Sequence, residues 1–345
     1  MKTVLLTGGA GFFGGIVKNR LLDAGYRCVS IDLCPDPTVH TDLTTIQADI
    51  RDVRLLDRIY QQYRFDAIIH CAAMLAHAVK DKRLLWESNV DGTRNIAEMA
   101  RRHSVPKLVF TSSNCLWGEN LGRPVREDDP PRPCEIYGRS KWEGERILSE
   151  YSRDLNTVII RCPTIIDSGR LGLLSILFEF IHEGRTVWVV GGGKNKYQFI
   201  YAQDLADACL SSLHYGRSET FNIGSDGVLP LRDVFQYVIG ESGSESKIRA
   251  LPRGATLMGM RLAYYARISP LGPYHYKMIA EDFEFDTSRI KRELGWRPTL
   301  TNEQMLSRAY WYYLENCQRA QNWEDVSAHR QPARMGIIRL LKWVS

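Results

Sequence analysis

The chain has 345 residues, of which 44% are hydrophobic and 25% are charged. These fractions are close to globular averages, so they exclude a disordered chain, a collagen, a coiled coil and a small disulfide-stapled scaffold. At about 150 residues per domain, the length predicts two domains or one large α/β unit. The formal net charge is +5, and the basic residues are scattered, so we predict no nucleic-acid partner.

The cysteines and the apolar runs indicate the cellular compartment in which the protein is expected. None of the eight cysteines forms a Cys-x-x-Cys pair, so we predict free thiols in a reducing cytoplasm and no metal site. The longest apolar run, Leu171 to Phe178, is far shorter than the roughly 20 residues that span a bilayer. The N-terminus lacks the pattern of a signal peptide, and we expect no transmembrane helix.

Short apolar runs alternate with helical periodicity along the first half of the chain. After a first run at Val4 to Leu6 and a glycine cluster, residues 13–22 repeat at helical spacing. Further strands are expected at Arg27 to Asp32, Phe65 to Cys71, Lys107 to Thr111 and Thr157 to Cys162. This alternation predicts the α/β class with a doubly wound parallel sheet.

The pattern loosens from about residue 165. We expect a helix near Leu171 to Glu183, a turn at Gly191 to Gly193 and a helix at Asp204 to Tyr215. The chain is therefore divided into a dinucleotide-binding domain, 1–165, and a smaller, mixed α/β substrate domain, 166–345. Because no linker marks the boundary, we expect the second domain to be partly interleaved with the first.

The sharpest motif is the glycine cluster after the first strand. Gly8 and Gly11 would let a pyrophosphate approach the backbone amides, and Gly14 would let the following helix pack closely on the strand. Asp32 ends the second strand, where a carboxylate binds the adenosine ribose hydroxyls and repels a 2′-phosphate. The motif predicts NAD as the cofactor, in preference to NADP.

A second motif supplies acid–base chemistry. Tyr137 and Lys141 stand four residues apart, which puts them on one face of a helix. A neighbouring ammonium lowers the pKa of a phenol and makes it a usable general base. A hydroxyl from the segment Thr111 to Ser113 could hold the substrate oxygen beside the phenol.

Together these residues resemble the extended short-chain dehydrogenase/reductase family, and within it the nucleotide-sugar epimerase/dehydratase group. The resemblance covers nearly the whole chain, through Thr7 to Gly14, Asp32, Ala48 to Asp52, His70 to Ala73, Ser88 to Ile96, Phe110 to Gly118, Tyr137 to Lys141, Asp204 to Ala208 and Leu294 to Pro298. It implies a Rossmann-like sheet.

The resemblance also implies roles for individual residues. Ser113, Tyr137 and Lys141 match the catalytic set. The cofactor contacts that it implies come from Gly8, Gly11, Phe12, Phe13, Gly14, Asp32, Asp49, Ile50, Ala72, Ala73, Asn89, Thr111, Tyr137, Lys141 and Pro163. In this set Asp49 and Ile50 flank the adenine, and Asn89 orders the active-site helix.

Two departures narrow the reaction and weaken the assignment of a nucleotide sugar. Sugar dehydratases of the group carry Asp and Glu directly after the catalytic hydroxyl, where this chain has Asn114 and Cys115, so dehydration is disfavoured. Tyr197 stands where an Arg would clamp the nucleotide diphosphate; Lys194, Lys196 and Arg170 are alternative sources of charge.

Two further residues, Cys115 and His77, each allow two interpretations. Cys115 is either a small packing residue or the acid/base of a 3,5-epimerase. His77 is either a substrate contact or a solvated loop residue.

We predict an NAD-dependent nucleotide-sugar epimerase, with C4 epimerisation of a UDP-hexose as the leading case. The resemblance implies that Tyr137 deprotonates the sugar hydroxyl, that a transient 4-keto intermediate turns over, and that hydride returns to its opposite face. One alternative is an NAD-dependent dehydrogenase or reductase of a sugar, steroid-like or lipid-linked alcohol. Another, from a different class, is a non-catalytic NAD-sensing protein.

The resemblance further implies a homodimer whose interface consists of helices near Leu84 to His103 and Tyr137 to Tyr151. Apolar residues at Ile96, Met99 and Ala100, with Trp142, Ile147 and Leu148, favour such an interface. The C-terminal segment Met335 to Val344 mixes apolar and basic residues. It is either a terminal helix or tail of the domain itself or a weak contact with a membrane surface or partner.

Overall fold

The computed structural model describes residues 1–75, 81–169, 172, 174–266 and 273–317. Its centre is a parallel sheet of seven strands in the order β10-β6-β5-β4-β1-β2-β3. The strands are β1 (Thr3–Thr7), β2 (Arg27–Asp32), β3 (Leu43–Gln47), β4 (Ala67–His70), β5 (Lys107–Ser113), β6 (Asn156–Cys162) and β10 (Glu219–Asn222). The strand order reverses between β1 and β4, so a crevice opens there at the carboxyl ends of the strands.

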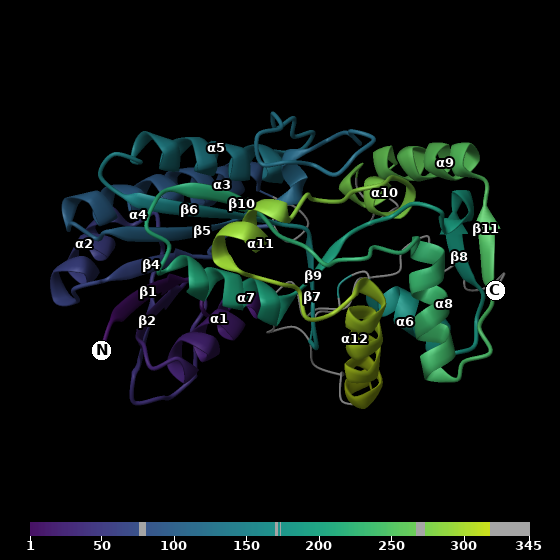
Figure 1. Cartoon of the computed structure of the whole chain (residues 1–345), viewed down its shortest axis with the longest axis horizontal. Helices are drawn as coiled ribbons and strands as arrows, with labels where there is room; N and C mark the ends of the chain where they lie inside the picture. Colours follow the sequence, from purple (N-terminus) through teal and green to yellow (C-terminus); the bar gives the residue numbers. More distant parts are fainter. Residues whose placement is uncertain (76–80, 170–171, 173, 267–272, 318–345) are drawn as a thin grey trace.

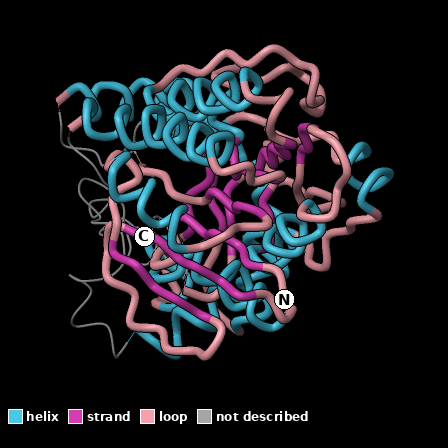
Figure 2. The backbone as a smooth tube through the Cα atoms, turned by 90° about the vertical axis from the view of Figure 1, so that its left-hand side faces the viewer, coloured by secondary structure: helices cyan, strands magenta, loops and turns pink. Residues whose placement is uncertain are grey.

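Helices cover both faces of this sheet (Figures 1 and 2). One face carries α2 (Val53–Gln62), α3 (Lys82–Trp86), α4 (Gly92–Arg102) and α5 (Ile136–Glu150); the other carries α1 (Phe12–Asp23), α7 (Ala202–Ser212) and α11 (Ser288–Leu294). Consecutive residues of β1 point to opposite faces, so Val4 and Leu6 pack with α1 and α7 while Leu5 packs with α2 and α4. Burial on both faces explains the continuous apolar runs of the sequence.

The smaller elements extend from the middle of the molecule to the end opposite the N-terminal strands (Figure 1). Two short parallel sheets pair β7 (Thr164–Ile166) with β9 (Phe199–Tyr201) and β8 (Val187–Val190) with β11 (Ile248–Leu251). The remaining helices are α6 (Leu174–His182), α8 (Leu231–Ser242), α9 (Arg253–Tyr265), α10 (Pro273–Ala280) and α12 (Asn302–Cys317). Strand β10 lies in this half of the sequence but pairs with β6 of the large sheet.

The predicted α/β class and the Rossmann-like parallel sheet are confirmed. The predicted strand Arg27–Asp32 has these exact bounds, and the helix expected near Leu171 to Glu183 is α6. Strand β3 was not predicted, because its burial is only partial and its sequence has no strong alternation.

One argument for the dimer is wrong. Ile96, Met99, Ala100, Ile147 and Leu148 are at most 1% exposed within the single chain, and four of them, all but Ile147, belong to the core cluster between the sheet and its helices. Trp142, the sixth residue of that argument, is partly buried against a cluster that includes Trp117. Their apolar character is explained without a second subunit. The predicted dimer therefore depends on the family resemblance alone.

Candidate active site

The glycine turn after β1 is shaped by close backbone contacts. Gly8 has φ +80°, and a Cβ there would lie 2.8 Å from the amide nitrogen of Ala72. A Cβ at Gly14 would lie 1.9 Å from the carbonyl oxygen of Gly8. Within the described part of the chain, no side chain caps the N-terminus of α1 at Gly11. This cradle fits a dinucleotide pyrophosphate, because the helix N-terminus favours an anion and the glycines leave the backbone accessible.

Asp32 is fixed against this turn. Its carboxylate accepts hydrogen bonds from the amide of Ala10 at 3.0 Å and from the amide of Cys34 at 2.9 Å. The charge therefore lies at the end of β2, next to the glycine cradle. In that position it can accept hydrogen bonds from a ribose diol.

The segment after β3 follows the rim of the same crevice. Asp49 accepts hydrogen bonds from the Arg51 guanidinium, at 2.6 Å to Nη2, and this pairing lowers the pKa of the Asp49 carboxyl. Ile50 is buried and packs where Gly92 leaves room for it, since a Cβ at Gly92 would lie 2.5 Å from Ile50 Cδ1. Both predicted adenine-side residues are thus held by contacts within the chain.

A directional chain of hydrogen bonds lies beneath the crevice. Thr93 donates its hydroxyl to the carbonyl of Asn89 at 2.7 Å, so Thr93 must accept from Nε2–H of His70 at 3.0 Å. His70 Nδ1 then accepts from the Thr7 hydroxyl at 2.6 Å, and Thr7 in turn accepts the amide of Ala72 at 3.1 Å. Burial is the main reason that the pKa of His70 is lowered to about 3, and the imidazole is neutral.

Asn89 joins this chain to the helix that carries the tyrosine. It lies in a π-helical turn, Glu87–Asp91, between α3 and α4. Its amide donates to Ser140 Oγ at 3.0 Å, and Ser140 donates to the carbonyl of Tyr137 at 2.8 Å. Its oxygen also accepts the amide of Met74 at 2.7 Å. A π-turn is uncommon and often marks a functional site; here it turns the amide inward.

The three predicted catalytic residues come from two adjacent elements. Ser113 ends β5, Tyr137 lies in the first turn of α5 and Lys141 one turn later. Lys141 is 3% exposed, and its Nζ lies 3.9 Å from the centre of the Phe110 ring. Burial lowers the pKa of Lys141 to about 8, against the opposing effect of Cys162 and other neighbours. The ammonium is therefore still charged at neutral pH.

Cys115 packs against the start of α5. A Cβ at Gly138 would lie 2.1 Å from the carbonyl oxygen of Cys115, so glycine is needed for this close approach. Burial, followed by the charge of Glu135, raises the pKa of the Cys115 thiol far above its ordinary value. A protonated thiol is a poor acid/base, which favours the packing interpretation of this residue.

Two of the residues that depart from the family pattern, Asn114 and Tyr197, contact each other. Asn114 donates its side-chain amide to the hydroxyl of Tyr197 at 2.7 Å, and its oxygen lies 3.4 Å from Ser113 Oγ. Tyr197 is 2% exposed. These two residues belong to the site through a long-range contact. The sequence indicated them only as departures from the family pattern.

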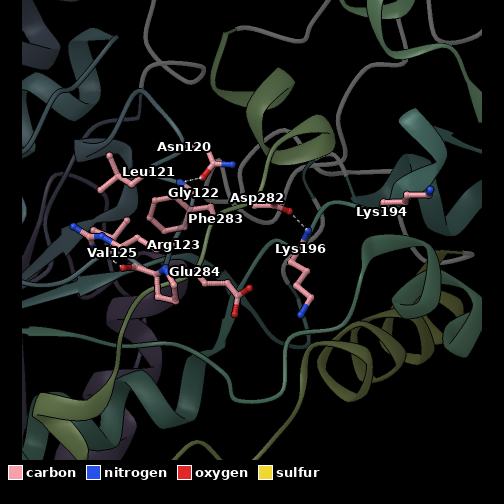
Figure 3. Close-up of a pocket in the computed structure, with 11 residues that line it drawn as sticks. Asn120, Leu121, Gly122, Arg123, Val125, Lys194, Lys196, Asp282, Phe283 and Glu284 are labelled. Carbon is pink, nitrogen blue, oxygen red and sulfur yellow. Dashed lines mark hydrogen bonds between the residues drawn. The ribbon is translucent and has the colours of Figure 1, made fainter.

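A cleft leads from these residues to the surface. Its inner part is lined by Asn114, Trp117 and Tyr197, and it adjoins a cavity of about 290 Å³ through Asn120, Asp282 and Phe283. The lining of this outer cavity has both signs of charge, from Arg123, Lys194, Lys196, Asp282 and Glu284 (Figure 3). The buried indole nitrogen of Trp117 has no hydrogen-bond partner within the described residues.

The other predicted residues are placed as follows. Thr111 donates to the carbonyl of His70 at 3.3 Å, and Phe12 and Phe13 are buried at the start of α1. Ala73 is exposed after β4, and Pro163 is buried between β6 and β7. His77, Arg170 and the segment Met335 to Val344 lie outside the described residues.

No described helix is long and apolar enough to cross a membrane. No cluster of three or more His, Cys, Asp or Glu arranged for a metal ion occurs in the described ranges.

Comparison with known proteins agrees with this geometry. Residues 4–224 match the model of the NAD dependent epimerase/dehydratase family. The chain is 34% identical over 346 residues to the uncharacterized protein y4nG of Sinorhizobium fredii, covering 99% of this chain and 86% of that protein. It is 33% identical over 287 residues to UDP-glucose 4-epimerase 2 of Oryza sativa subsp. japonica, with 70% of each covered.

A solved structure shares the fold. The UDP-glucose-4-epimerase from Stenotrophomonas maltophila, with bound NAD and formylated UDP-arabinopyranose, superposes with a TM-score of 0.76 at 23% identity, covering 93% of this chain and 100% of that one. At this identity the likeness shows the fold alone. The family match and the glycine cradle give the same cofactor, NAD, and the chain belongs to the NAD-dependent epimerase/dehydratase family.

Proposed function

We propose that this protein is an NAD-dependent nucleotide-sugar epimerase that inverts C4 of a UDP-hexose through a transient 4-keto sugar. The observation that carries the proposal is the composition of the site after β5. Ser113, Tyr137 and Lys141 complete a hydroxyl–phenol–ammonium set, while Asn114 and Cys115 supply neither of the carboxylates that elimination of water requires. The reaction that this site supports is therefore oxidation and reduction of the sugar without elimination of water.

Different residues of the chain carry out different steps of a reversible alcohol oxidation. NAD, when bound, supplies the acceptor and donor of hydride. The Tyr137 phenol exchanges the proton of the substrate hydroxyl, and the buried Lys141 ammonium stabilises the phenolate. Ser113 Oγ accepts the amide of Cys115 at 3.2 Å and donates to Asn114 Oδ1 over a long 3.4 Å contact; turning this hydroxyl would let it donate to the substrate oxygen instead. Epimerisation needs the ketone to turn over in the cleft between the two proton transfers.

The nucleotide diphosphate is assigned to the outer cavity. Lys194 and Lys196 line it and offer positive charge, in place of the Arg that Tyr197 replaces. The carboxylates of Asp282 and Glu284 line the same cavity and limit how much negative charge it accepts. The substitution by Tyr197, whose hydroxyl is occupied by Asn114, favours the second candidate, a net dehydrogenase or reductase of an alcohol without a diphosphate.

Incorporation of solvent deuterium and net formation of NADH distinguish C4 epimerisation, 3,5-epimerisation and net dehydrogenation. The protein is incubated in heavy water with UDP-, GDP- and dTDP-sugars, and the products are analysed by mass spectrometry. C4 epimerisation gives an inverted sugar with no solvent deuterium on carbon and no net NADH. NADH formed in step with product would establish the dehydrogenase, and carbon-bound deuterium together with an inactive Cys115→Ser variant would establish 3,5-epimerisation. A Tyr137→Phe variant should lose at least about 10²–10⁴-fold in turnover and still bind NAD.

We further propose a cytoplasmic homodimer. Seven of the eight cysteines, all except Cys317, are described as free thiols, which suits a reducing compartment. The dimer is supported by the family resemblance of α4 and α5. Sedimentation velocity at micromolar concentration tests it, and a monomer there would contradict it.

A further inference from the structure

Helix α9 presents its apolar side chains outward. Met258 is 59% exposed, Leu262 63% and Tyr265 81%, while Ala263, at 9% exposed, is the only buried residue of this helix. Figure 1 shows α9 along the outer edge of the molecule, at the end farthest from the N-terminal strands. A helix on a protein surface ordinarily has the opposite arrangement, with its apolar face toward the core.

Helical geometry places these residues on one stripe. At 100° per residue, Met258, Leu262 and Tyr265 fall within about 60° of one another, and Ala263 lies roughly 100° or more from each of them. The inner side of the helix is attached to α10, where the hydroxyl of Tyr276 donates to the carbonyl of Met260 at 2.9 Å. The apolar stripe therefore faces away from the protein. An exposed apolar stripe of this kind marks an interaction site.

The charge of the surrounding sequence is entirely positive. Between Glu245 and Glu281 there is no acidic residue, while this span contains Lys247, Arg249, Arg253, Arg261, Arg267 and Lys277. Arg253 and Arg261 are exposed on α9, and neither forms an ion pair with another described residue. The partner of this face must therefore combine an apolar layer with negative charge.

We propose that the outward face of α9 binds an anionic lipid surface. Met258, Leu262 and Tyr265 enter the boundary between head groups and acyl chains, and Arg261, which lies about 40° from Tyr265 around the helix, faces the lipid phosphates, as in interfacial amphipathic helices. A second copy of this chain fits less well. A two-fold contact would bring the same patch together from both subunits and would oppose two acid-free, basic segments.

Co-sedimentation with vesicles tests the proposal on the full chain. The protein should bind vesicles of phosphatidylcholine mixed with phosphatidylglycerol, and should bind pure phosphatidylcholine more weakly. The triple variant Met258→Gln, Leu262→Gln, Tyr265→Gln should bind the mixed vesicles at least about 10-fold more weakly, because three apolar side chains no longer leave water. The Arg261→Gln variant should show a weaker preference for the anionic lipid, because Arg261 borders the apolar stripe.

A matched control removes exposed apolar side chains elsewhere. Val39, Tyr237 and Trp311 are 95%, 39% and 45% exposed and lie outside α9, so their replacement by Gln should leave vesicle binding unchanged. Circular dichroism verifies that each variant folds. Failure of the wild-type chain to bind mixed vesicles, or equal binding by the α9 triple variant, would overturn the proposal. So would a loss of self-association in that variant without any lipid binding, because α9 would then contact a second copy.

Discussion

The neutral, buried His70 makes folding stability depend on pH in a defined way. In the folded chain the imidazole donates from Nε2 to Thr93 and accepts at Nδ1 from Thr7. Both ring nitrogens form hydrogen bonds, and burial lowers the pKa of the imidazole to about 3. In the unfolded chain the same side chain has its ordinary pKa of about 6.5.

The magnitude follows from proton linkage. Between pH 6.5 and 3 the unfolded chain binds a proton on His70 and the folded chain does not, so stability falls as the pH is lowered through this window. Each pH unit corresponds to about 1.36 kcal/mol. His70 alone should therefore destabilise the folded chain by about 2 kcal/mol at pH 5 relative to pH 7, and the full effect is about 5 kcal/mol near pH 3.

Urea unfolding of the wild type and of a His70→Gln variant, each at pH 7 and pH 5, isolates this contribution. Glutamine keeps one donor and one acceptor but does not titrate. The variant should be less stable at pH 7, since a buried hydrogen-bonded group is altered at a cost of about 1–3 kcal/mol. Its loss between pH 7 and pH 5 should be smaller than that of the wild type by about 2 kcal/mol.

Nitrogen chemical shifts of the wild-type imidazole provide an independent measurement. We expect His70 to remain the neutral Nε2–H tautomer at pH 5. Equal pH dependence in the two proteins, or a protonated His70 at pH 5, would refute the assigned hydrogen-bond chain.

Three other substitutions test the site. Asp32→Ala should weaken NAD binding at least about 10-fold, since hydrogen bonds to a charged group are lost; calorimetry showing that the unmodified protein prefers NADP would contradict this role. Lys141→Met should abolish turnover and yet raise the free energy of unfolding at pH 7 by about 1–3 kcal/mol, because the folded chain no longer buries a charge; an unchanged or lower value in urea would contradict it. Tyr197→Phe removes the hydroxyl that accepts from Asn114 and should lower kcat/KM by about 3–10-fold, whereas Tyr60→Phe, which removes a buried hydroxyl without a partner among the described residues, should leave kcat/KM unchanged.

The sequence by itself determined the features that depend on neighbouring residues. The glycine turn, the acidic end of β2 and the four-residue spacing of Tyr137 and Lys141 are local patterns. A tight turn with a positive φ favours glycine, and a helix repeats every 3.6 residues whatever surrounds it. The α/β class followed from the same local alternation of apolar runs and helical periodicity.

Tertiary structure decided what joins distant parts of the chain. The hydrogen bond between Asn114 and Tyr197 spans 83 residues, and no local pattern indicates that the two departures from the family meet. The apolar residues of α4 and α5 could equally have faced a subunit or a core; only packing showed that Ile96 and Leu148 lie inside the chain's own core. Burial likewise fixed the neutral state of His70, because the pKa of a side chain depends on the dielectric and the partners around it and not on its neighbours in sequence.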